Sequence, residues 1–267
     1  MSDRRIRSFT EVAPGVHFVE GPASNWTVLT GAGSDPTRVE VALIDAGYPE
    51  DLALVDESIV RAGGRIDDLS TILVTHGHSD HIGTIAPLVA RTGARVLGHA
   101  AELPNITRVE LHQIAIADIL PVLWKPRIAN WVVHAIRSGG LSDVAVASPV
   151  AFGSDVQVDG YASRVVAGHT VLQIPTAGHT PGHNGYLLPE HGVLITGDAI
   201  ITDHPTTSVA GPQILPPMWH TDAREAVRAI DAFGDLDATV VLPGHGPLLR
   251  ATPADIVRRV SERLHGR

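Results

Sequence analysis

Short apolar runs, rich in β-branched residues, recur along the chain and end at glycine, proline or polar residues. Runs of this kind predict buried strands. Two loosely alternating runs lie between residues 15 and 30, and a third spans Val39 to Ile44. We expect the first two to pair as antiparallel strands, with the third beside them and Asp45 at its end.

The next part of the chain alternates between strand-like and helical patterns. Residues 49–61 and 81–91 carry apolar side chains at helical spacing, and residues 71–74 and 94–98 are short apolar runs. A strand, a helix and another strand in this order favour parallel pairing.

An apolar insertion occupies residues 102–150, approximately. Two stretches, Ile114–Trp124 and Ile128–Ile136, are predicted to be helical, and Pro121 should kink or cap the first. The charged break at 125–127 excludes a transmembrane hairpin. The insertion could form a lid or substrate channel, a dimer surface or a contact with lipid, or it could simply pack on a sheet.

Strand patterns return between residues 153 and 197, and a long proline-rich loop then leads to His220. Such a loop is often functional, so we expect it to help form a substrate pocket. His204 and His220 within it are candidates for substrate contact or proton transfer. Asp222 and Thr252 have the pattern of helix caps, which predicts two final helices.

The strongest chemical signal is a cluster of three histidines and one aspartate. The run Thr71–Val74 leads directly to His76, His78, Asp80 and His81. Imidazole and carboxylate are ligands suited to zinc and similar first-row metals. Four donors this close in sequence cannot easily bind one ion, so two neighbouring ions are the simpler solution.

Further donors should then follow later strands. Three apolar runs, beginning near residues 172, 192 and 239, are each followed by one such residue: His179, Asp198 and His245. The glycine that precedes each of them suits a tight turn at a strand end. Seven donors at four strand ends predict two metal sites that share a bridge.

The order His76-x-His78-x-Asp80-His81, then His179, Asp198 and His245, resembles the metallo-β-lactamase-fold hydrolases. The resemblance implies an α/β fold, an αββα sandwich of two mixed sheets flanked by helices. We expect residues 1–267 to form a single such domain that includes the insertion.

The resemblance also implies the roles of the ligands. One metal would be held by His76, His78 and His179, and a second by Asp80, His81 and His245, with Asp198 bridging them. Asp45 resembles an aspartate that orients a ligand imidazole in this family, although a helix cap is an equal alternative. His183 is expected to support the site rather than bind metal.

Two neighbouring cations can lower the pKa of a shared water, so that a metal-bound hydroxide attacks the substrate. Asp80 is the candidate catalytic residue, since it could bind metal and hold the proton of the nucleophile. Two Zn²⁺ ions are expected, and Fe or Mn would also suit these ligands. We expect hydrolysis of an ester, thioester or lactone; the alternatives are a di-iron oxidoreductase or a phosphodiesterase.

Two departures separate the chain from particular relatives. His81 and Asp198 stand where the zinc lactamases use arginine and cysteine, which makes β-lactam hydrolysis less favoured. Ile200 and Ile201 follow Asp198, where lactonases of this fold often carry a tyrosine.

Composition narrows the range of partners. The 267 residues carry a formal net charge of −9 and no cysteine, so nucleic acid is a disfavoured partner and thiolate ligands are absent. No apolar segment follows the basic N-terminal residues, and no apolar run is long enough to span a membrane. We expect a cytoplasmic enzyme with a small-molecule, partly apolar substrate, no stable membrane insertion and an open choice between monomer and homodimer.

Overall fold

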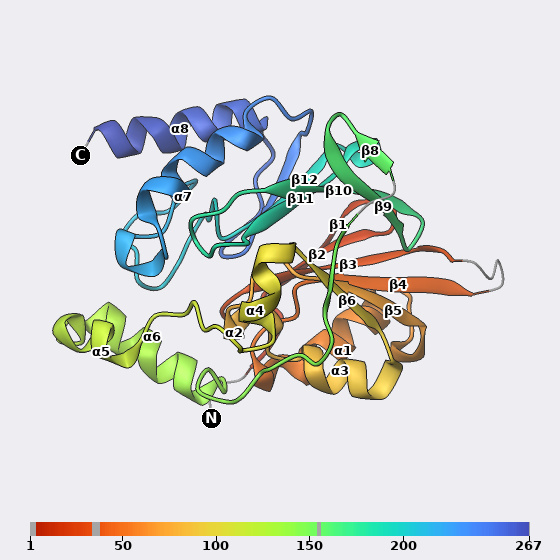
Figure 1. Cartoon of the computed structure of the whole chain (residues 1–267), viewed down its shortest axis with the longest axis horizontal. Helices are drawn as coiled ribbons and strands as arrows, with labels where there is room; N and C mark the ends of the chain where they lie inside the picture. Colours follow the sequence, from red (N-terminus) through yellow and green to blue (C-terminus); the bar gives the residue numbers. More distant parts are fainter. Residues whose placement is uncertain (1–3, 34–37, 154–155, 267) are drawn as a thin grey trace.

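Two β-sheets lie face to face in the structure, with helices on both outer faces (Figure 1). The structure is a computed structural model that describes residues 4–33, 38–153 and 156–266. Helices α1 (Leu52–Arg61) and α3 (Ile85–Thr92) cover one side, and α7 (Ala223–Ala229) and α8 (Pro253–His265) cover the other. This arrangement confirms the predicted αββα sandwich.

The seven-stranded sheet follows the order of the sequence. Its strands are β1 (Ser8–Ala13), β2 (Val16–Glu20), β3 (Asn25–Ala32), β4 (Val39–Ile44), β5 (Leu69–Leu73), β6 (Arg95–Gly98) and β7 (Val150–Ala151). Strands β1 to β4 pair antiparallel, and β4 to β7 pair parallel. The parallel part confirms the pairing predicted from strand–helix alternation, whereas β1 lies outside the expected runs.

The six-stranded sheet has the order β13-β12-β11-β10-β9-β8. Its strands are β8 (Val156–Val158), β9 (Tyr161–Val166), β10 (His169–Pro175), β11 (Asn184–Leu188), β12 (Val193–Gly197) and β13 (Val240–Pro243). Only the β12–β13 pair is parallel among these described strands.

The remaining helical segments are short. They are η1 (Pro49–Asp51), η2 (Ile66–Asp68), α2 (Ser79–Ile82), η3 (Ala100–Glu102), α4 (Leu103–Ile106), α5 (Ile116–Ile119), η4 (Leu120–Val122), α6 (Pro126–Arg137), η5 (Pro189–His191), η6 (Pro217–Trp219) and η7 (Ile230–Phe233). Asp222 and Thr252 cap α7 and α8 through their side chains, as predicted.

The single helix predicted from His81 to Arg91 is wrong, because α2 and α3 are separate. Gly83 lies between them, and a Cβ atom there would come within 2.4 Å of the Tyr48 carbonyl carbon. The backbone of this break therefore packs directly against residues 48–49, which brings the start of α2 close to the end of β4.

Apolar side chains form three layers. One cluster joins the outer face of the seven-stranded sheet to α1 and α3, through residues such as Val55 and Leu88. A second fills the space between the sheets, with Phe18 and Tyr186 among its fully buried members. A third lies beneath α8 and includes Phe233. The layers hold the strand ends in fixed positions on both sides of the site.

The insertion forms less helix than expected in its first half. The stretch predicted from Ile114 to Trp124 contains only α5 and η4, and Pro121 lies in the first turn of η4. The second half forms α6 close to its predicted bounds. Ile128 of α6 packs with Ile201, Leu215 and Trp219 of the loop after β12. Helix α6 therefore packs against that loop, whereas Ile106, Val144 and Val146 of the insertion join the cluster on the outer face of the seven-stranded sheet.

Within the described ranges, no helix combines the length and the apolar character that crossing a bilayer requires.

Candidate metal centre

All seven predicted donors meet at one edge of the sandwich. His76, His78, Asp80 and His81 follow β5, and the other three follow β10, β12 and β13 in turn: His179, Asp198 and His245. Three sets of three have ligand atoms within 4.8 Å of one another: His76–His78–His179, His76–His81–Asp198 and Asp80–His81–His245. The structure thus brings together side chains from four strand ends.

Asp198 lies between the two outer sets. Its Oδ2 is 3.5 Å from His179 Nε2 and 3.2 Å from His245 Nε2. Its Oδ1 is 3.4 Å from His81 Nε2. Asp80 Oδ2 is 3.4 Å from His245 Nε2, on the side away from His78 and His179. The Asp198 carboxylate therefore contacts both outer sets, whereas the Asp80 carboxylate contacts only the set that contains His245.

The orientation of His81 and His76 is set by hydrogen bonds behind them. The Asp45 carboxylate accepts a hydrogen bond from His81 Nδ1 at 2.9 Å and from the Thr75 hydroxyl at 2.7 Å. Because that hydroxyl donates to Asp45, it accepts from His76 Nδ1 at 3.0 Å. Both imidazoles then donate through Nδ1, and Nε2 is the nitrogen of each ring that faces the centre.

The other three histidines are held in the same way. His78 Nε2 donates to the carbonyl oxygen of His112 at 2.7 Å, and His245 Nδ1 donates to that of Ala23 at 2.8 Å. His220 Nε2 donates to the Leu215 carbonyl at 2.9 Å, so its Nδ1 accepts from His179 Nδ1 at 3.2 Å. Metal-binding histidines commonly have such an acceptor behind them, which fixes the tautomer.

Several inward atoms have no hydrogen-bond partner. His76 Nε2, His81 Nε2 and Asp198 Oδ1 are buried and unpaired in the described protein. Buried polar atoms are normally satisfied, so unpaired ones at a cluster of imidazoles and carboxylates fit divalent cations. The donor set contains nitrogen and oxygen only, which suits zinc, iron or manganese.

Electrostatics divide the centre into two halves. Burial opposes the charged form of His81, but Asp198, Asp80 and Asp45 outweigh it and raise the pKa of His81 to about 10. The pKa of His245 is also raised, since Asp198 and Asp80 overcome the effect of its burial. Without cations, these carboxylates therefore keep His81 protonated and favour the protonated form of His245.

The opposite half favours neutral rings. Burial, reinforced by neighbouring histidines, holds the pKa of His76 and of His179 well below the ordinary value. Asp198 is buried, which alone would favour its neutral form, but His245 and His81 hold its pKa well below the usual range. The bridging position is thus occupied by a carboxylate anion.

Two buried groups fix the ligand loops. Glu102 Oε1 accepts from the Gly77 amide at 2.8 Å, and Oε2 accepts from the Gly182 amide at 2.9 Å. His183 Nδ1 lies 2.9 Å from the Thr176 hydroxyl, and its Nε2 accepts from the Asp198 amide at 3.0 Å. His183 therefore supports the site as expected, because its Nε2 already accepts the hydrogen bond from the Asp198 amide.

Sequence reasoning missed Glu102 and left Asp45 and His220 open. Asp45 caps none of the described helices; it holds His81 and Thr75. His220 lies behind His179, whereas His204 is one of the residues that line a cavity beside the metal centre. No signal in the sequence pointed to Glu102, because the Gly77 and Gly182 amides that it accepts from are 25 and 80 positions away.

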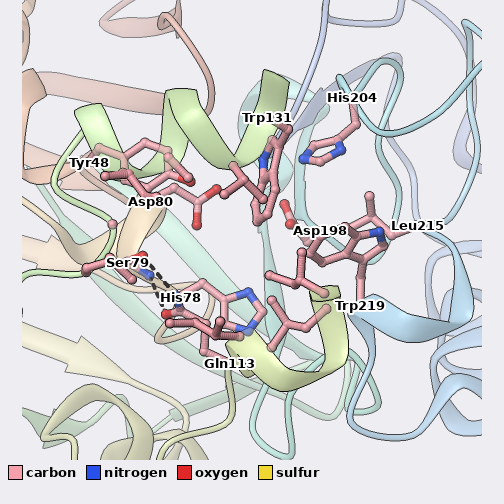
Figure 2. A pocket seen from close by; sticks show the side chains of 18 of the residues that line it. Tyr48, His78, Ser79, Asp80, Gln113, Trp131, Asp198, His204, Leu215 and Trp219 are labelled. Carbon is pink, nitrogen blue, oxygen red and sulfur yellow. Dashed lines mark hydrogen bonds between the residues drawn. The ribbon is translucent and has the colours of Figure 1, made fainter. Parts of the chain in front are cut away.

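A cavity opens directly above the centre (Figure 2). Asp80 and Asp198 point into it, and Trp131 of α6 extends between them in this view. Trp219 and Leu215 of the loop after β12 form the neighbouring wall. The predicted contribution of that loop to a pocket is therefore confirmed by its lining residues.

A family model described as the metallo-beta-lactamase superfamily matches residues 22–245. The chain belongs to the metallo-β-lactamase superfamily. It is a metal-dependent hydrolase, in agreement with the geometry of its donors and with the names of its relatives. The match spans all seven donors and the insertion.

Individual relatives are distant. Probable metallo-hydrolase YflN of Bacillus subtilis (strain 168) is 28% identical over 248 residues, which cover 88% of this chain and 85% of that protein. A hydroxyacylglutathione hydrolase of Acidiphilium cryptum (strain JF-5) is 38% identical over 85 residues, 32% of this chain and 30% of that one. The second match concerns a segment only.

Solved structures share the fold. A metallo-beta-lactamase family protein from Thermus thermophilus superposes with a TM-score of 0.67 and 22% identity, covering 96% of this chain and 81% of that one. The subclass B3 metallo-beta-lactamase BJP-1 of Bradyrhizobium japonicum has a TM-score of 0.61 and 16% identity, over 98% and 94% of the two chains. At this identity the likeness concerns the fold alone.

Proposed function

We propose that the chain binds two divalent cations and hydrolyses an ester, thioester or lactone of a small, partly apolar substrate. One cation is assigned to His76, His78 and His179, and the other to Asp80, His81 and His245. Asp198 would contribute to both. The observation that carries the assignment is the position of the Asp198 carboxylate, which lies within 3.5 Å of imidazole nitrogens of both sets.

The chemistry that bound cations supply is a water of lowered pKa as nucleophile and polarisation of the substrate carbonyl. The protein contributes fixed imidazoles, since each has a hydrogen-bond acceptor behind it. A preorganised site of this kind loses little energy to rearrangement during reaction.

Asp80 has two roles in the proposal. Its carboxylate lies beside His245 and also lines the cavity, with 16% of the side chain exposed. Asp198, by contrast, is 3% exposed and enclosed by imidazoles. Asp80 would therefore help to hold a cation, and its carboxylate is also placed to accept a proton at the floor of the cavity.

The bond cleaved is proposed from the cavity and the relatives together. The cavity wall beside the metal centre is largely apolar, which suits an organic acyl group. The relatives named as hydroxyacylglutathione hydrolases support a thioester, although they match only parts of the chain. Zinc is the proposed metal, because an imidazole and carboxylate site without sulfur suits it.

The test combines metal analysis with a substrate panel. Purified protein would be loaded with zinc, manganese or iron, and assayed on chromogenic esters, thioesters, lactones and phosphodiesters. We expect two metal equivalents per chain, ester, thioester or lactone hydrolysis, and loss of activity on chelation that added metal restores. Activity that survives complete removal of metal would refute the proposal, and iron with visible absorbance but no hydrolysis would favour the oxidoreductase alternative.

A further inference from the structure

One wall of the cavity is built almost entirely by the insertion. Apolar side chains from α5, η4, α6 and the segments beside them line this wall: Ile114, Ile119, Leu123, Trp131, Val132 and Ile136. Leu215 and Trp219 face them from the loop after β12. Apolar surface lost from water on ligand binding favours ligands that are themselves apolar.

The apolar wall begins at the metal centre. Trp131 lies near Asp80 and Asp198 in Figure 2, and its ring packs edge-on against Trp219 with centroids 4.7 Å apart. The ring of His204 lies 6.2 Å from that of Trp131 and 4.8 Å from that of His245. An aliphatic substrate chain that lies along Trp131 would have its reacting carbonyl end beside Asp80 and Asp198.

The wall also continues to the surface. Leu120, Ile136 and Leu141 line the cavity, yet 60%, 51% and 67% of their respective surfaces are exposed. Each belongs to the insertion, the last of them to the segment directly after α6. An extended apolar group can therefore remain in contact with apolar side chains from the solvent to the metal centre.

The charge of the cavity lining also restricts the ligand. Among the described residues that line the cavity there is no lysine or arginine, and the ionisable ones other than Tyr48 are histidines and aspartates. Arg108 and Arg127 of the insertion bond instead to the backbone carbonyls of Gly77 and Thr207. An anionic group in the substrate would find no counter-charge along this wall, apart from the bound cations themselves.

We propose that the insertion is an acyl-chain pocket, and that the substrate carries an uncharged aliphatic chain whose carbonyl end lies at the metal centre. This inference rests on the proposed function and names its substrate class. Trp131 determines specificity by contacting the chain beside the reacting carbonyl. Glutathione thioesters and phosphodiesters, which bring negative charge into the cavity, are disfavoured on the same grounds.

The first test is a series of p-nitrophenyl esters from acetyl to octanoyl, assayed with the metal-loaded protein. Burial of each added methylene should raise kcat/KM up to about fourfold until the wall is filled. An ester with a terminal carboxylate on a six-carbon chain should be hydrolysed much more slowly than hexanoyl. Equal kcat/KM across the series, or preference for the charged ester, would overturn the pocket while leaving hydrolysis itself established.

Substitutions in α6 test where the aliphatic chain of the substrate lies. Trp131→Ala should lower kcat/KM for octanoyl at least about tenfold and for acetyl less than about threefold, with metal content unchanged. Trp124→Ala is the matched control, because Trp124 belongs to the same insertion but is 78% exposed and does not line the cavity. Ala135→Leu fills the cavity from α6 and should shorten the preferred chain. Unaltered chain-length preference in both Trp131→Ala and Ala135→Leu would contradict the assignment.

A binding assay separates this inference from the proposed reaction. Decanol cannot be hydrolysed, and its saturable binding should change the tryptophan fluorescence of the wild type and of Trp124→Ala. In Trp131→Ala, which keeps Trp219 on the cavity wall, decanol should bind at least about tenfold more weakly. If no ester, thioester or lactone is cleaved while decanol binds in this pattern, the proposed function fails and the apolar pocket stands. If esters are cleaved but decanol does not bind, the pocket is refuted and the reaction stands.

Discussion

Asp45 and His81 are joined by a hydrogen bond of 2.9 Å between the aspartate Oδ2 and the histidine Nδ1. Asp45 adopts a φ of 59° at the end of β4, a left-handed conformation that aspartate tolerates better than most residues. The same carboxylate accepts from the backbone amide and the hydroxyl of Thr75, at 2.8 Å and 2.7 Å. One aspartate therefore orients His81 directly and His76 through Thr75.

Asp45→Asn should weaken metal binding by about 10- to 100-fold. The carboxylate accepts from three donors, whereas an amide must turn its NH₂ group toward at least one of them. The hydrogen bonds that orient His81 directly, and His76 through Thr75, would then no longer all be made. Equilibrium dialysis against buffered zinc would measure the change, with Asp255→Asn as control, because the Asp255 side chain is 59% exposed on α8 and pairs with Arg258 of the same helix. Unchanged affinity in Asp45→Asn would contradict the orienting role.

His220→Ala should weaken binding at the His76–His78–His179 set, again by about 10- to 100-fold. His220 accepts the hydrogen of His179 Nδ1 and so keeps the opposite nitrogen free. His204 belongs to the same loop, but its Nδ1 bonds to the Thr206 hydroxyl and not to a proposed ligand. His204→Ala should therefore retain both metals. Metal content after dialysis distinguishes the variants, and equal loss in both would show that the loop, not His220, is responsible.

Metal binding should release protons at neutral pH. The pKa of His81, raised to about 10, means that this residue is protonated at pH 7 in the metal-free protein, and the raised pKa of His245 shifts that ring toward its protonated form. Cations must displace these protons, so affinity at the Asp80–His81–His245 set should rise with pH, by about tenfold per unit for each proton released. The lowered pKa values of His76 and His179 predict no release from the other set. Zinc titration in weak buffer with a pH indicator would count the protons, and a count near zero would oppose this charge distribution.

Glu102→Gln should destabilise the fold by about 3 kcal/mol, because charge-assisted hydrogen bonds inside the protein are lost. Glu102 is fully buried, and its oxygens accept from Gly77, Asn105, Thr180 and Gly182. An amide in its place would direct NH₂ at two of these donors. Urea unfolding of metal-free protein would measure the loss. The exposed Glu57→Gln should change stability by no more than about 0.5 kcal/mol, and a similar small change in Glu102→Gln would contradict the anchoring role.

Local patterns in the sequence were sufficient for the strands and for the list of donors. The short apolar β-branched runs before the donors form buried strands, and a polar residue that follows such a strand lies at the edge of the sheet. For this reason His76, His179, Asp198 and His245 could be predicted to meet although they are far apart along the chain. The same local reasoning failed at Gly83, where contact with residues 48–49 breaks a helix that the spacing alone would continue.

The tertiary structure alone decided which nitrogen of each histidine faces inward and which wall the insertion forms. His245 is fixed by the carbonyl of Ala23, a residue 222 positions earlier, and His179 by His220, whose own tautomer depends on Leu215. Backbone carbonyls exist at every residue, so the sequence does not reveal which one will serve. The apolar face of α6 likewise had several possible partners, and its packing with Ile201, Leu215 and Trp219 selected the loop beside the metal centre.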